Sequence, residues 1–178
     1  TATVANGKTH MQDLASSLSR ILPFSQAAGV GLNQVMGAMA GLTAQGVKSK
    51  QAALDMKMAI VALSAPTKSM TKAFTQWGLS STQVATRMQT DMPGAFQEMS
   101  NAISKVYKEG SPQYLAAMKA MMGGSSQMAG VVLLSGSHFK AFQSAVDNVS
   151  ASVKAGGKNV VGWSQVQQDL NFKIAQAK

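Results

Sequence analysis

The sequence predicts an all-α fold, built from short amphipathic helices joined by corners rich in Gly, Pro and Ser. Apolar residues recur at intervals of three and four positions, which places them on one face of an α-helix. Gly, Pro and Ser interrupt this pattern at short intervals, as they do where helices begin and end. No stretch alternates apolar and polar residues in the manner of a half-buried β-strand.

The first helix follows a connector over residues 1–8 and is expected to begin at Thr9, which can cap it. Its apolar face consists of Met11, Leu14, Leu18, Ile21 and Leu22. Pro23 falls inside this pattern and is expected to kink or divide the helix, because proline removes a helical hydrogen bond.

Residues 27–81 form the stretch around which the chain is organised. Two helices are predicted to meet at Gly46, where a positive φ can end the first, and Ser49 is expected to cap the second. A third helix is predicted to have Pro66 in its first turn and to stop at Gly78. The apolar faces of the three helices are Leu32, Val35, Met36, Met39 and Leu42, then Ala52, Ala53, Met56, Ile60 and Leu63, and then Met70, Ala73, Phe74 and Trp77.

Three further helices are predicted from their caps. Ser80 or Ser81 is expected to cap the first, Asp91 the second, and Ser111 the third, with Pro112 in its first turn. The apolar positions of these helices are Val84 and Met88, then Phe96, Met99, Ile103 and Val106, and then Leu115, Met118 and Met122.

The last part of the chain predicts two more helices, after a break at residues 123–126 and a brief apolar segment at 128–132. The first helix carries Phe139, Phe142, Val146, Val149 and Val153 on one face. The second carries Val160, Trp163, Val166, Leu170 and Ile174, and it reaches the end of the sequence without a cap. We therefore expect it to continue into a coiled coil or bundle.

Length and composition suit a helical protein of modest size. The 178 residues include 46% hydrophobic residues and no cysteine, which excludes disulfides and thiolate metal sites. We divide the chain into a helical core region (1–81), a short-helix region (82–135) and C-terminal amphipathic helices (136–178). Because the sequence does not begin with methionine, we expect it to be part of a longer polypeptide.

The 13 methionines fit mainly a buried role, since most of them fall on predicted apolar faces. Met36, Met39, Met56, Met99 and Met118 are predicted to lie in the core. The better candidates for contact with another subunit are Met58, Met121 and Met128.

The chain is strongly basic, with 16 Lys and Arg against seven Asp and Glu and a formal net charge of +9. Arg20 and Arg87 are its arginines, and the lysines are scattered from Lys8 to Lys178. This pattern favours a generally basic, solvated surface over a dedicated nucleic-acid groove. Contact with DNA or acidic lipid is the alternative.

No catalytic, cofactor-binding or metal-binding residue is assigned, and the chain is not predicted to be an enzyme. His10 and His138 lie far apart and fit surface or cap positions better than a metal site. Glu98 and Glu109 could form the carboxylate pair of a glycosidase, but local ion pairs with Lys105 or Lys108 explain them better.

Small-residue helices, a Gln-Gly corner and a Pro-Thr helix start follow one another in a specific order over residues 6–81. The residues that carry this order are Ala28, Gly29, Val30, Leu42, Gln45, Gly46, Val47, Ala52, Ala53, Leu63, Pro66, Thr67, Ala73, Phe74, Gly78, Leu79 and Ser80, after a lead-in at residues 6–15. In this order the region resembles the core of phage tail tape measure proteins. From 82 to 135 the resemblance is weaker, because residues 121–124 depart from the family's Leu-Phe-Gly motif.

The resemblance implies a structural virion protein that scaffolds the tail tube, sets tail length and takes part in genome ejection at the tail tip. It places the protein inside the phage tail or at its tip, and in the host cytoplasm during assembly. It also implies a homotrimer that contacts tail tube, distal tail or hub proteins, with tail assembly chaperones as further partners and with contact to DNA or a host membrane during ejection. The apolar stripe from Val160 to Ile174 supports self-association, since it has no obvious partner within the chain.

A function of another class is a basic amphipathic membrane-active protein, pore-forming or toxin-like. The lysine surplus and the amphipathic helices support it. Gly and Pro interrupt the apolar faces of these helices, however, and the sequence therefore favours the structural role.

Overall fold

The computed structural model describes residues 11–124 and 129–155, and within these ranges the chain is α-helical without a β-strand. The all-α prediction is confirmed. In chain order the helices are α2 (Met11–Ala27), α3 (Leu32–Ala44), α4 (Ser49–Ser64), α5 (Lys68–Gln76), α6 (Ser81–Thr90), α7 (Met92–Ser104), α8 (Pro112–Met121), α9 (Ala129–Val132) and α10 (Phe139–Lys154), with the 3-10 turn η2 (Gly136–His138) leading into α10.

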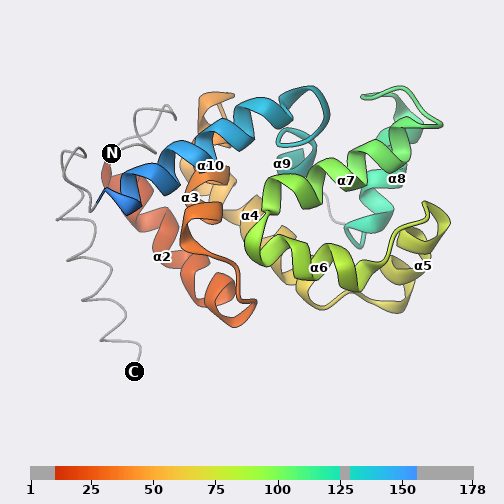
Figure 1. Ribbon diagram of the computed structural model, residues 1–178, viewed down its shortest axis with the longest axis horizontal. Helices are drawn as coiled ribbons and strands as arrows, with labels where there is room; N and C mark the ends of the chain where they lie inside the picture. Colours follow the sequence, from red (N-terminus) through yellow and green to blue (C-terminus); the bar gives the residue numbers. More distant parts are fainter. Residues whose placement is uncertain (1–10, 125–128, 156–178) are drawn as a thin grey trace.

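The helices form two groups (Figure 1), and buried side chains from both belong to one apolar core. α2, α3 and α10 lie together on one side of the molecule, and α5 to α8 form the other side. α4 joins the groups, since it packs against α2 and α3 and also against α6 and α9. Buried residues from all three predicted segments, including Met36, Phe96 and Phe142, belong to the same apolar cluster. The division of the chain at 81 and 135 stays a prediction.

α3 is the most deeply buried helix that the structure describes. Its ten residues from Gln34 to Thr43 are all buried, on every side of the helix. Their sequence contains Gly, Ala and Thr between the larger residues, and such small side chains let neighbouring helices approach from several directions. α2 and α4 cover one side of α3, and α10 covers another.

Gly37 and Gly41 of α3 face α10. A Cβ atom on Gly37 would lie 2.7 Å from the Cα of Val146 and 2.9 Å from its backbone nitrogen, distances that real side chains do not tolerate. A Cβ on Gly41 would meet the end of the Leu134 side chain at 2.8 Å. Glycine at position 37 is therefore required for the backbones of α3 and α10 to pack this closely.

Two amide side chains of α3 connect it to distant parts of the chain. Asn33 Nδ2 donates a 2.8 Å hydrogen bond to Ser150 Oγ on α10. Buried Gln34 donates from Nε2 to the carbonyl of Thr90 at 2.8 Å, and its Oε1 accepts from the backbone N–H of Met92 at 3.1 Å. Gln34 therefore satisfies both backbone groups at the α6–α7 junction, which would otherwise lack partners.

Most of the predicted caps are confirmed. Ser80, Asp91 and Ser111 each precede a helix and accept a backbone N–H at distances of 3.3, 2.9 and 3.2 Å. Gly46 and Gly78 have φ values of +89° and +70°, as expected for residues that end helices in the left-handed region.

Two predictions about helix starts are wrong, and a predicted helix division is not found. Ser49 is the first residue of α4, and the cap position belongs to Lys48, which makes no side-chain cap hydrogen bond. Pro66 lies one residue before Thr67, the N-cap of α5, whose side chain accepts from Met70 N. α2 is not divided at Pro23, because one missing hydrogen bond is outweighed by the buried apolar side chains before it, and the predicted kink stays a prediction.

The predicted burial of several side chains is also corrected. Val106 is 66% exposed because α7 ends at Ser104, and Val153 is 44% exposed near the end of α10. Met121 is fully buried between helices, so it is not a subunit contact. Trp77 is only half-buried, with its ring edge against Tyr107 at a centroid distance of 5.8 Å.

Other methionines follow the prediction. Met36, Met39, Met56, Met99 and Met118 are buried in the core, with at most 1% exposure. Met58 is half-buried, and its role as a subunit contact stays a prediction. The cap Thr9, the side chains of Met11 and Leu14, Met128 and the apolar stripe from Val160 to Ile174, with Trp163, lie outside what the structure describes.

We expect Gly37→Ala to lower the free energy of unfolding by about 2 kcal/mol or more. The added methyl would force apart the backbones of α3 and α10, and such overpacking exceeds the roughly 1 kcal/mol that alanine gains in helix propensity. Gly41→Ala is the matched control, because only a side-chain end must move there. Urea unfolding followed by circular dichroism measures both variants, and equal stability of the two would contradict the role of Gly37.

Candidate functional site

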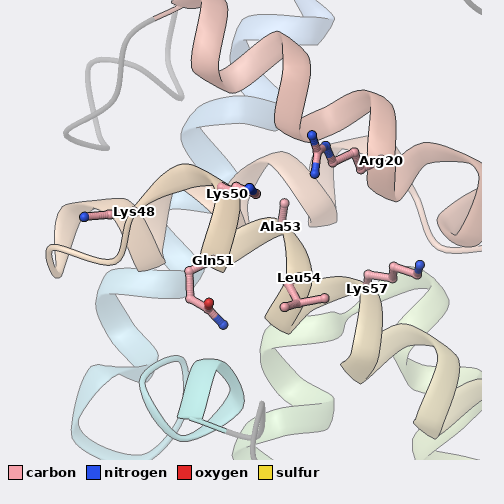
Figure 2. Close-up of a pocket in the computed structure, with 7 residues that line it drawn as sticks. All are labelled: Arg20, Lys48, Lys50, Gln51, Ala53, Leu54 and Lys57. Carbon is pink, nitrogen blue, oxygen red and sulfur yellow. The ribbon is translucent and has the colours of Figure 1, made fainter.

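A groove between α2 and α4 has a volume of about 710 Å³ and is rich in cationic side chains. Figure 2 shows that Arg20 comes from α2 and the other lining residues from α4 and the turn before it. The residues that line it are Arg20, Lys48, Lys50, Gln51, Ala53, Leu54 and Lys57.

Helical periodicity explains why these residues share one face. Lys50, Leu54 and Lys57 are spaced four and then three residues apart on α4, so their side chains follow one stripe along the helix. Ala53 is nearly buried at 2% exposure and forms the floor, where its small side chain leaves room beside Arg20 of α2. The inner face of α4 is buried and, apart from Asp55, apolar, which fixes the helix and therefore the orientation of the stripe.

The positive charges of the groove are not neutralised by carboxylates that the structure describes. Both ion pairs in the described part of the chain involve Arg87, far from the groove in the sequence and on α6. Lys57 contacts an aromatic face instead, with its Nζ 4.1 Å from the centroid of the Phe24 ring. The groove also begins at the N-terminal turn of α4, where the helix dipole adds to the positive potential.

Asp55 lies next to these residues in sequence but points away from the groove into the protein. Its side chain is buried, with 4% exposure, and Oδ1 accepts a 2.7 Å hydrogen bond from Gln51 Nε2. A Cβ added to Gly130 of α9 would lie 2.7 Å from the Asp55 Cβ, so α9 covers this carboxylate closely. Burial raises the pKa of Asp55 above its ordinary value, and the hydrogen bond from Gln51 opposes this rise in part.

The two glutamates that could form a glycosidase pair have separate structural roles, and their predicted lysine partners are wrong. Glu98 pairs with Arg87 at 3.2 Å, across from α7 to α6. Glu109 Oε1 accepts from the backbone N–H and the hydroxyl of Ser137, each at 2.9 Å, and so holds the start of η2. Tertiary contacts decide both partners, and these are not visible in the local sequence.

Arg87 lies at the centre of a small polar network on the other side of the molecule. Its guanidinium contacts Asp91 at 2.9 Å and Glu98 at 3.2 Å, beside a cavity of about 360 Å³. The hydrogen bond that Arg87 donates to the Asp91 carboxylate is the main reason that the pKa of Arg87 rises above its ordinary value. Asp91 also caps α7, so the network serves to fix the α6–α7 junction.

No metal site is found among the residues that the structure describes, since no three potential ligands lie together there. His138 is exposed at the end of η2, in a surface position as expected, and His10 lies outside the described residues.

The sequence suggested lysines dispersed over the surface, and the structure gathers three of them with an arginine. Lys48, Lys50 and Lys57 fall within ten residues, which was the one local signal for the groove. The contribution of Arg20 depends on how α2 packs on α4, and no spacing within either helix could have indicated it.

Comparison with known proteins gives one match. A family described as phage-related minor tail protein matches residues 1–123 of this chain. No curated protein and no solved structure matches it.

We expect Asp55→Asn to stabilise the protein at neutral pH, with a benefit that shrinks as the pH falls. Because the folded-state pKa of Asp55 is raised, its proton stabilises the fold at low pH, and this contribution is lost as pH rises through that pKa. The asparagine resembles the protonated carboxyl and retains an acceptor for Gln51. Urea unfolding between neutral pH and about pH 3 measures the difference.

The control for this prediction is Asp147→Asn, since Asp147 is an exposed carboxylate on α10 that also accepts from a glutamine four residues away. Its effect on stability should vary less with pH. A stability difference for Asp55→Asn that stays constant across this pH range would show that burial of the charge has no such effect.

Proposed function

The chain belongs to the phage-related minor tail protein family, and from this premise we propose that it is a region of a tail tape measure protein. Membership makes it a structural component of a phage tail. The proposed role is finer: the protein scaffolds the tail tube during assembly, sets tail length, and takes part in genome ejection at the tail tip.

The observation that carries this proposal is where the residues of the tape measure resemblance lie. Leu42, Ala52, Ala53, Leu63 and Phe74 are all buried, with at most 2% exposure, and Gly46 adopts its positive φ between α3 and α4. The shared pattern therefore consists of residues that this fold needs for its core and its corners. A pattern of this kind supports a common fold more strongly than shared surface residues would.

The proposed partners follow from the same role. We propose a homotrimer around the tail axis, in contact with tail tube and distal tail or hub proteins, and assisted by tail assembly chaperones. Its proposed place is inside the tail or at the tip, after assembly in the host cytoplasm.

A membrane-active function has no specific support from the described helices. None of them is long and apolar enough to cross a bilayer. Leu54 and Val61 of α4 are exposed at 41% and 44%, but they are separated by Lys57 and form no continuous apolar face.

We expect an insertion of about 28 helix-forming residues after Ala155, in the phage gene, to lengthen the tail by about 42 Å. This expectation follows from a helical ruler, because an α-helix rises about 1.5 Å per residue. Electron microscopy of purified particles measures tail length.

The control is the same insertion at Gly110, in the exposed turn between α7 and α8. There the inserted segment leaves and re-enters the bundle at one point, so tail length should not change. Tails of equal length in the two variants would contradict a tail-length role.

We expect Val166→Asp combined with Leu170→Asp to dissociate the oligomer, because two charges would be placed in the apolar stripe. Ser164→Asp with Gln168→Asp adds the same charges away from the apolar stripe of the predicted helix and serves as control. Sedimentation of the purified chains measures the oligomeric state. If both double variants sediment like the unaltered protein, the stripe is not the interface.

A further inference from the structure

We infer that the groove between α2 and α4 binds the phosphate backbone of double-stranded DNA and does so without reading the bases. The groove consists of Arg20, Lys48, Lys50 and Lys57 around a floor of Ala53 and Leu54. This inference does not depend on the tail-length role, because it rests on the charges and shape of the described residues.

The charges of the groove are available to a ligand. Arg20, Lys48 and Lys50 make no ion pair among the described residues, and the adjacent carboxylate of Asp55 is buried and bonded to Gln51. Arg20 faces Lys50 and Ala53 across the groove, while Lys48 and Lys57 lie toward its two ends (Figure 2). Gathering like charges in this way costs free energy unless an anion neutralises them.

The spacing of the cations fits a nucleic-acid strand. Lys50 and Lys57 are two helical turns apart, so their Cα atoms are separated by about 10.5 Å along α4. Phosphates of one DNA strand advance by about 3.4 Å along the duplex axis, so a stripe of this length lying parallel to that axis covers about three phosphate levels. Arg20 lies on the opposite wall and can contact the same strand from the other side.

The residues that line the groove can contact the phosphate backbone of DNA, but they offer few side chains that could recognise its bases. No aromatic side chain lines the groove, so unpaired bases have no surface on which to stack. Among the lining residues, Arg20 and Gln51 are of the types that pair with base edges, and the Gln51 amide already donates to Asp55. Lysines that hold phosphates as point charges give affinity that depends on salt and not on sequence.

A concave groove suits a rod-shaped polyanion better than a lipid surface. A helix that binds at a bilayer needs a continuous apolar face, whereas the outer face of α4 alternates Lys50, Leu54, Lys57 and Val61. The exposed apolar area of Leu54 is also small and lies between charges, which gives an acidic protein helix little to pack against.

The test measures binding of the full chain to a fluorescent DNA duplex of about 30 base pairs, across salt concentrations of about 50 to 200 mM. The groove variant combines Arg20→Gln, Lys48→Gln and Lys50→Gln and keeps Lys57, which packs on Phe24. The control variant combines Lys108→Gln, Lys119→Gln and Lys154→Gln, three exposed lysines outside the groove. Both variants lose three positive charges, and circular dichroism verifies that both remain folded.

We expect the unaltered chain to bind duplexes of different sequence equally well and to lose affinity steeply with salt. The groove variant should bind roughly tenfold more weakly or worse, and its slope of log affinity against log salt should fall by about three. The control variant should retain most of the affinity and slope.

Three results would overturn the inference. The first is equal weakening in both variants, which would mean that dispersed surface charge attracts DNA. The second is tighter binding to vesicles with anionic lipid or to polyglutamate than to the duplex at the same salt. The third is no binding to the duplex even at the lowest salt.

Discussion

The close approach of α10 to α3 over Gly37 is the constraint on which the rest of the structure depends. At that position the two backbones leave no space for a Cβ atom, so the crossing is fixed at one point. Once it is fixed, Asn33 can bond to Ser150 and the Phe142 ring can lie 6.0 Å from that of Phe96. The contact between α3 and α10 thereby connects the first group of helices to α7, which belongs to the second.

The side chains of α4 have two roles, since one face of the helix packs in the core and the other lines the groove. Its inner face buries Met56, Ile60 and Leu63 against neighbouring helices, and its outer face carries the lysines of the groove. Because the inner face is anchored by apolar packing, the stems of Lys50 and Lys57 project from a packed helix, while Lys48 lies in the turn that leads into it. The positive stripe can therefore keep its geometry without a carboxylate to hold it in place.

The sequence predicted those features that depend on neighbouring residues. The caps Ser80, Asp91 and Ser111 were identified because the residue that caps a helix and the N–H that it accepts lie three positions apart. Lys48 was missed as the N-cap of α4 because nearby Ser49 is the better cap by residue type, and Lys48 makes no side-chain cap hydrogen bond. Helical periodicity correctly predicted that the methionines near the helix centres are buried. It wrongly predicted burial of Val106, because the pattern was extended past the end of α7.

Features that join distant segments could not be predicted in this way. Glu98 has lysines nearby in sequence and pairs with an arginine eleven residues earlier, because the α6–α7 corner brings the two together. The groove is a further case, since it requires Arg20 and the α4 lysines to meet across a helix pair. Met121 could be assigned to the core only once the packing of α8 was known.

The α3–α10 crossing has a consequence for how the protein is made. Asn33 and its partner Ser150 are separated by 117 positions in the sequence, so a ribosome adding roughly 5 to 20 residues per second needs about 6 to 23 seconds to add the second after the first. During that interval no helix covers the glycine face of α3. This apolar surface of the nascent chain stays exposed until α10 has been translated and can pack on it.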